Sequence, residues 1–84
     1  SADAGLALPD GCIAVAASVT GSVWAVKVTP GERVHRGQAL IVLEAMKMEV
    51  AVEAEGGGIV EEILCAAGGS VSVGQALVIL RPGA

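Results

Sequence analysis

The chain has 84 residues, of which 54% are hydrophobic, and its nine acidic side chains against five Lys and Arg give a formal net charge of −4. This composition predicts one small globular domain with a modest core and excludes an intrinsically disordered chain. The acidic balance argues against a nucleic-acid-binding face, and every apolar run is far shorter than the ~20 residues that span a bilayer.

The predicted elements follow the same order in each half of the chain. Residues 1–11 are expected to form an N-terminal linker and residues 12–84 the folded domain. The first half then predicts a β-branched strand at 23–28, a turn at 29–31, a short segment around Val34 and an apolar strand at 40–43. The second half predicts the same elements at 60–65, 66–69, around Val71 and at 77–80. The runs are short and bounded by Gly or Pro, so helix is expected to be minor or absent.

The two halves are an internal repeat. When residues 17–43 are placed on residues 54–80, an offset of 37, ten of 27 positions are identical without a gap. A solenoid needs three or more repeats, so two copies indicate a pseudo-twofold fold instead. The sequence therefore predicts an all-β flattened sandwich or barrel with about four strands in each half. The identical pairs are Ala17/Ala54, Gly21/Gly58, Val23/Val60, Gly31/Gly68, Val34/Val71, Gly37/Gly74, Gln38/Gln75, Ala39/Ala76, Leu40/Leu77 and Leu43/Leu80.

The repeat is broken where the first half reads EAMKMEV, residues 44–50. The same corner in the second half is the end of the chain, so pseudo-symmetry predicts that Lys47 lies at the tip opposite the termini. In an extended tip, alternation would turn Met46 and Met48 one way and Lys47 the other. We therefore expect two thioethers to anchor the turn while the ammonium stays in water. A displayed lysine can act as a nucleophile, form a Schiff base or be acylated.

Nothing else in the sequence predicts a catalytic or metal site, so no catalytic residue and no metal ligand is assigned. His35 is expected to be an exposed loop residue, and Lys27, the other lysine, an outward strand residue. Clustered ligands at metal-binding spacing are missing, and the glycines form no nucleotide-binding motif. Cys12 and Cys65 are too far apart for a CxxC motif, and Cys65 is expected to be a small buried hydrophobe.

The sequence EAMKME resembles the biotin-attachment motif of the biotinyl domain family, which includes the carrier domains of biotin-dependent carboxylases. The resemblance covers about residues 14–81, including PGERVHRGQALIVLEAMKMEV and the repeated GGSVSVGQALVIL. It implies a flattened sandwich of two four-stranded antiparallel sheets. It also implies that Lys47 is biotinylated, with Ala45, Met46 and Met48 as the flanking motif and Glu44 and Glu49 as candidates for ligase recognition.

The family's activity implies what the domain does and which proteins it meets. A biotin protein ligase would activate biotin as its adenylate and join it to Lys47. The biotin would then carry a carboxyl group from a biotin carboxylase site to a carboxyltransferase site. The domain would have no active site of its own, and neither nucleic acid nor membrane is an expected partner. No signal peptide is recognisable, and the two cysteines fit a reducing compartment, so we expect the cytoplasm, with the mitochondrial matrix as the alternative.

Several alternatives stay open at this stage. A lipoyl domain shares the repeat and the tip lysine, although the two methionines favour biotin. An all-β interaction module with an incidental lysine is the other alternative. The chain departs from the family pattern at ASVTG (17–21), where two prolines are replaced, and it has no thumb insertion at 29–38. GSVWAVKVTPGERV, with Trp24, is similar to urea carboxylase (urea amidolyase) carrier domains, but acyl-CoA and pyruvate carboxylases are not excluded.

Overall fold

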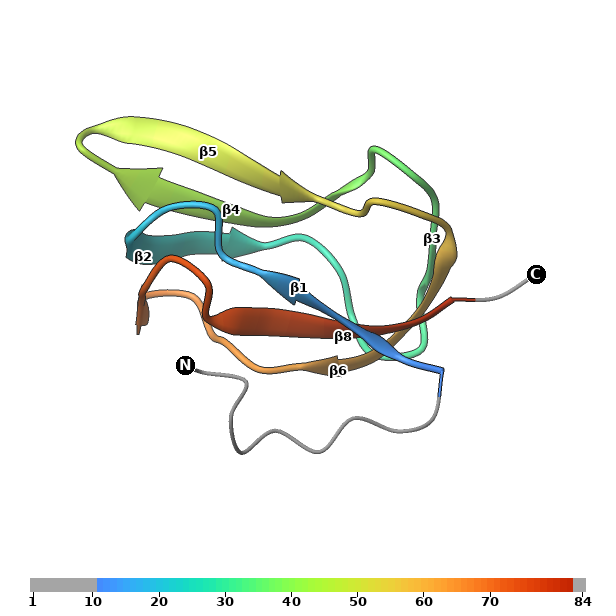
Figure 1. Ribbon diagram of the computed structural model, residues 1–84. Helices are drawn as coiled ribbons and strands as arrows, with labels where there is room; N and C mark the ends of the chain where they lie inside the picture. The colour runs from blue at the N-terminus through green and yellow to red at the C-terminus, as the bar shows by residue number, and fades with distance from the viewer. Residues whose placement is uncertain (1–10, 83–84) are drawn as a thin grey trace.

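The computed structural model describes residues 11–82, which form eight β-strands and no helix (Figure 1). Apart from Gly11, the expected N-terminal linker (residues 1–11) lies outside the described residues, as do residues 83–84 of the expected domain. The strands are β1 (Ile13–Ala16), β2 (Gly21–Val26), β3 (Arg33–Val34), β4 (Ala39–Ala45), β5 (Met48–Glu53), β6 (Gly58–Ile63), β7 (Ser70–Val71) and β8 (Ala76–Pro82).

The strands form two four-stranded antiparallel sheets, in the orders β1-β8-β6-β3 and β5-β4-β2-β7. Strands β1–β4 come from the first half of the chain and β5–β8 from the second. Exchanging each strand with its counterpart in the other half converts the order of one sheet into that of the other. The predicted all-β sandwich of two pseudo-symmetric halves, with four strands in each, is confirmed.

The symmetry extends to individual backbone hydrogen bonds and bulges. The register shift between Val23 and Ala25 in β2 recurs between Val60 and Glu62 in β6, 37 residues later. At the turns, the Gly37 N–H donates to the Ala54 carbonyl at 2.8 Å, and the equivalent Gly74 N–H donates to the Ala17 carbonyl at 2.9 Å. Each half therefore holds the start of the other half in place.

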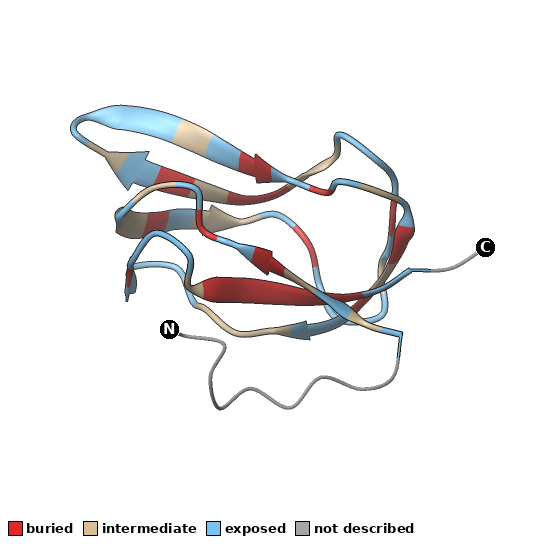
Figure 2. Ribbon diagram, viewed as in Figure 1, coloured by how far each residue is buried: buried red, intermediate tan, exposed pale blue. Residues whose placement is uncertain are grey.

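The core lies between the sheets, and equivalent residues of both halves build it. Buried residues occur on strands of both sheets (Figure 2). No polar or charged residue of the described chain is buried, so its stability rests on apolar packing. Seven equivalent pairs are buried in both halves: Val15/Val52, Ala17/Ala54, Val23/Val60, Val34/Val71, Leu40/Leu77, Ile41/Val78 and Leu43/Leu80. Five of the ten identical pairs of the repeat are therefore pairs of core residues.

Both β-branched strands end earlier than predicted, and Cys65 is less buried than expected. The strand predicted at 60–65 is β6, which ends at Ile63. The β-branched strand predicted at 23–28 ends at Val26, so Lys27 is exposed but follows β2 instead of lying within it. The Lys27 N–H still donates to the Leu40 carbonyl of β4 at 2.9 Å, and the chain then crosses to the other sheet, where the Gly31 N–H donates to the Val60 carbonyl at 2.7 Å. Cys65 is only partly buried against the core, and this burial raises the pKa of its thiol.

Candidate functional site

The most unusual backbone of the described chain lies in the hairpin that joins β4 to β5. Ala45 pairs with Met48, so only Met46 and Lys47 form the turn. Both have positive φ, 51° and 65°, and no other non-glycine residue of the described chain does. Positive φ at both central residues is the type I′ geometry, which matches the twist of a hairpin but usually requires Asn or Gly. The hairpin therefore holds its lysine in a strained conformation.

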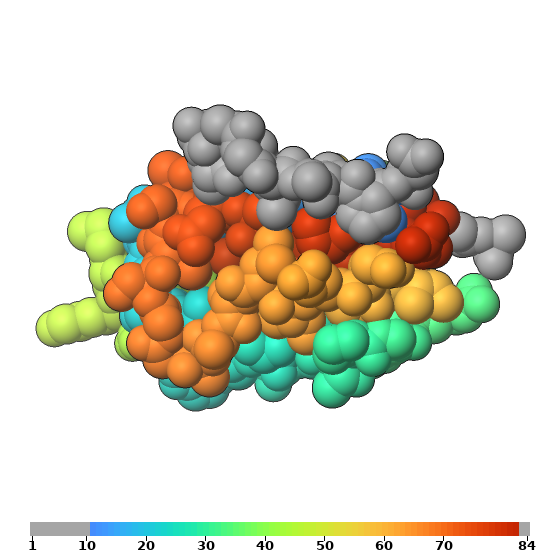
Figure 3. Space-filling view, turned by 90° about the horizontal axis from the view of Figure 1, so that it is seen from below, coloured from blue at the N-terminus to red at the C-terminus, as the bar shows by residue number. Residues whose placement is uncertain are grey.

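Lys47 lies at the free end of this hairpin. The residue is exposed, and the hairpin projects beyond the body of the domain (Figure 3). The described end of β8 lies at the opposite end of the sandwich (Figure 1), which confirms the predicted placement of the tip. The one ion pair of residues 11–82 joins Arg81 Nε to Glu61 Oε1 at 3.1 Å, so no carboxylate of these residues lies within 4.0 Å of the Lys47 ammonium. Its amine is accessible to a large reagent or enzyme.

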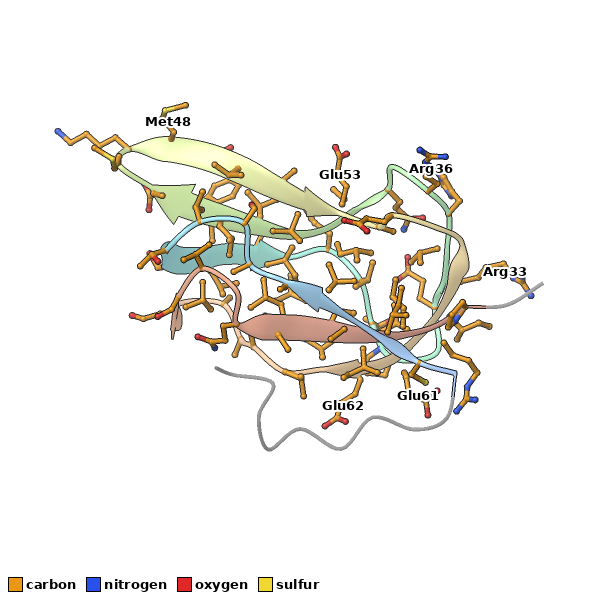
Figure 4. All side chains as sticks on the ribbon, in the orientation of Figure 1. Arg33, Arg36, Met48, Glu53, Glu61 and Glu62 are labelled. Atoms are coloured by element: carbon orange, nitrogen blue, oxygen red, sulfur yellow. The ribbon has the colours of Figure 1, made fainter. Side chains whose placement is uncertain are left out.

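The expectation that the two methionines anchor the turn is wrong. Met46 is 93% exposed and Met48 65% exposed. Met46 occupies the apex of a tight turn, so simple strand alternation does not apply to it. Met48 lies on the projecting hairpin, apart from the side chains that fill the space between the sheets (Figure 4). Two large apolar side chains therefore flank the lysine in solvent, an arrangement that indicates contact with another group.

The base of the hairpin has an acidic face. Glu44 and Glu49 lie directly opposite each other on β4 and β5, and both are exposed. Alternation places them on one face of the hairpin and the Ala45–Met48 pair on the other. Like charges in directly opposite positions destabilise a sheet slightly, so the fold itself does not favour this pair.

The strained turn leads to a prediction about stability. Replacing Met46-Lys47 by Asn-Gly should stabilise the domain by about 1–2 kcal/mol, because both new residues adopt positive φ readily. Urea denaturation followed by circular dichroism would measure the change. Lys47→Arg is the matched control, since it keeps a long cationic side chain at the same φ and should leave the midpoint unchanged. Equal midpoints for the Asn-Gly variant and the original chain would show that the turn is unstrained.

The remaining candidate residues do not assemble into a second site. His35 is exposed in a loop, as predicted, and Glu53, Glu55, Glu61 and Glu62 are exposed as well. Residues 11–82 contain no group of three or more His, Cys, Asp or Glu side chains placed to hold a metal ion. The same residues include no helix that is long and apolar enough to cross a membrane.

Three residues near the tip are not indicated by motif analysis. Val19 and Thr20, in the loop before β2, and Val73, in the turn before β8, line a shallow groove together with residues of the hairpin. The sequence signal that could have revealed them is the mismatch within the repeat. Their counterparts are Gly56, Gly57 and Arg36.

The fold and this hairpin define a class of small all-β domains that present one accessible lysine at the tip of a β-turn. The biotin/lipoyl family model, described as that of a biotin-requiring enzyme, matches residues 13–80. The chain belongs to this family. Membership gives the domain a carrier role and implies covalently bound biotin as the family's cofactor. The lysine geometry fits such a group, because Lys47 is exposed and its amine has no ion-pair partner within residues 11–82.

Two relatives show how the domain occurs in longer and shorter proteins. A putative urea carboxylase of Emericella nidulans is 39% identical over 72 residues, which cover 82% of this chain but 6% of the relative. The biotin/lipoyl attachment protein of Bacillus subtilis is 36% identical over 66 residues, which cover 79% of this chain and 90% of the relative. The chain thus corresponds to a small part of the first protein and to most of the second.

Solved structures have the same fold. The crystal structure of the Kluyveromyces lactis urea carboxylase matches with a TM-score of 0.84 and 31% identity, over 89% of this chain and 7% of that one. The lipoyl domain of the 2-oxoglutarate dehydrogenase complex from Azotobacter vinelandii matches with a TM-score of 0.67 and 32% identity, over 79% of this chain and 84% of that one. The resemblance to the biotinyl domain family is confirmed, and the fold is shared with a lipoyl domain.

Proposed function

We propose that Lys47 carries a covalently attached biotin and that the domain moves a carboxyl group between two active sites of a biotin-dependent carboxylase. The observation that carries this proposal is the exposed lysine on a strained two-residue turn, with no ion-pair partner in the described part of the chain. Such strain persists only where the surrounding structure imposes it, and it is commonest at functional sites. Ala45, Met46 and Met48 form the flanking motif in this proposal.

Attachment requires the chain to supply one nucleophilic amine. The Lys47 ammonium first gives a proton to solvent. Its nitrogen then attacks the activated carboxyl carbon of a biotinyl-adenylate supplied by a biotin protein ligase. The new C–N bond forms, the bond to AMP breaks, and a second proton leaves the nitrogen as the amide is completed. The product is neutral, so the formal charge of Lys47 with Glu44 and Glu49 changes from −1 to −2.

The acidic face of the hairpin suits recognition by the ligase. Glu44 and Glu49 are exposed and directly opposite each other, at a cost to the sheet that the fold alone does not explain. A basic surface on a ligase would offset their repulsion and would orient Lys47 toward the activated carboxyl group. These two carboxylates are therefore our candidates for ligase recognition.

The carrier role follows from where the tip lies. When bound, biotin supplies a ureido nitrogen that takes up and releases a carboxyl group. The rigid sandwich holds Lys47 away from the described end of β8, so the tip can enter an active site while the domain stays tethered. Tethering raises the local concentration of the carried group at both sites. The partners in this proposal are biotin carboxylase and carboxyltransferase domains, with urea as a candidate acceptor because urea carboxylases are among the similar proteins.

The location of the protein is also a proposal. The described chain contains two cysteines, and neither forms a disulfide. Free thiols suit a reducing compartment, so we place the domain in the cytoplasm, with the mitochondrial matrix as the alternative.

Mass spectrometry with two ligases tests the attached group. The chain should gain the mass of one biotinyl group when incubated with a biotin protein ligase, ATP and biotin. It should gain no lipoyl group from a lipoate ligase, ATP and lipoate. Uptake of the lipoyl group alone would favour the lipoyl alternative, whose fold the chain shares. No uptake of either group would favour an interaction module and overturn the proposal.

A further inference from the structure

A shallow groove of about 460 Å³ lies beside Lys47. None of its lining side chains is charged, and all but Thr20 are apolar. Several of them are well exposed, with Val73 64% and Met46 93% accessible to solvent. An exposed apolar surface in this position favours the binding of an apolar ligand. The lining residues are Val19, Thr20, Ala45, Met46, Met48, Val50 and Val73.

The pseudo-symmetry of the fold shows that the groove is not an inevitable feature of the sandwich. At the other end, the counterparts of Val19 and Val73 are Gly56 and Arg36. Arg36 lies at the end of the molecule opposite Met48 (Figure 4). The same backbone corner is therefore built with glycine and a charged side chain where there is no lysine tip. The apolar side chains occur only at the end that presents Lys47.

A hydrogen bond that is also confined to this end fixes the floor of the groove. The Val73 N–H donates to Thr20 Oγ1 at 2.9 Å, which ties the turn before β8 to the loop before β2. The counterpart of Thr20 is Gly57, which has no side chain to accept the equivalent bond. Val19, Thr20 and Val73 thus form a fixed shelf that presents two apolar side chains, although none of the three residues belongs to the attachment motif.

We propose that this shelf, with Met46 and Met48, is the resting site of the group attached to Lys47. The inference deepens the proposed function and rests on it. Amide formation removes the lysine charge, so the attached arm is a neutral chain of methylenes that gains by leaving water. The group attached to Lys47 can reach the groove, because the residues on both sides of Lys47 line it. The ring's polar atoms stay in solvent because the groove is open and shallow.

Resting there would protect the arm between visits to the two active sites. It would also shield Met46 and Met48 from water, which explains why two exposed methionines flank the lysine. An open groove releases the arm readily, since only part of its apolar surface is covered. The shelf therefore retains the arm weakly, as a carrier requires.

Methyl NMR of the biotinylated and unmodified domain tests this inference. We expect biotinylation to shift the methyl signals of Val19 and Val73, with nuclear Overhauser contacts from these methyls to the arm. In a Val73→Arg variant, which introduces the residue found at the symmetric position, the shift at Val19 should fall to the level of the unmodified protein. Arg36→Lys, at the far end, is the control and should change neither signal. Intact mass confirms that each sample carries biotin.

The outcomes separate this inference from the proposed function. Biotinylation that shifts only the signals of residues 45–48 would overturn the resting site and leave the proposed function standing. Failure of every variant and the original chain to take up biotin would overturn both. Concentration-dependent shifts at Val19 and Val73 in the unmodified domain would assign the groove to a second copy of the chain instead.

Discussion

A Lys47→Arg variant should fold normally and take up no biotin. The guanidinium of arginine stays protonated in proteins, so it cannot act as the nucleophile that forms the amide. Residue 47 is exposed and has no ion-pair partner in the described chain, so the exchange should leave stability unchanged. Intact mass after incubation with the ligase, ATP and biotin should show a complete loss of labelling.

Two further variants show whether the position of the amine matters as well as its presence. Lys27→Arg removes the other lysine, which is exposed directly after β2, and should label fully. Exchanging the turn residues, with Met46→Lys and Lys47→Met together, keeps the composition but moves the amine one residue within the turn. It should also abolish labelling, because each turn position directs its side chain differently. Efficient labelling of the exchanged variant would mean that the hairpin does not position the lysine.

The fold could be predicted from the sequence because each identity within the repeat has a physical cause. Val23, Leu40 and Leu43 recur because each fills the core in both halves. Gly31 and Gly37 recur because both adopt φ near 90°, which L side chains rarely do. Gln38 recurs because its side chain accepts a hydrogen bond from the His35 N–H, as the equivalent Gln75 does from the Ser72 N–H. A repeat of this kind specifies symmetry, core and turns together.

The geometry of the tip could not be predicted in the same way. Alternation assumes extended backbone, whereas Met46 and Lys47 both have positive φ. Neither residue has an intrinsic preference for that conformation, so the pairing of β4 with β5 imposes it. The groove has a similar origin, because Val19 and Val73 are 54 residues apart and carry no motif. Only the mismatch with their symmetric counterparts distinguishes them.

The role of Gly21 could not be predicted from the sequence either, because it depends on an adjacent strand. A Cβ placed on Gly21 would lie 2.2 Å from the Glu44 carbonyl oxygen and 3.2 Å from the Ala45 Cβ, at the base of the lysine hairpin. The equivalent Gly58 meets the Arg81 carbonyl oxygen at 2.5 Å. Both glycines are required for close approach of two backbones, which no local pattern reveals.

Gly21→Ala should therefore destabilise the domain by about 3 kcal/mol or more, at the upper end of the range for overpacking. The clash involves backbone on both sides, so only separation of β2 from β4 relieves it, and that movement also displaces Glu44 and the hairpin. Urea denaturation would measure the loss, and ligase labelling of the folded fraction should slow in parallel. Gly56→Ala is the control, because a Cβ there meets nothing within 4 Å, and its effect should stay within about 0.5 kcal/mol. If the two variants proved equally stable, β2 would not be packed against the base of the hairpin as closely as the structure has it.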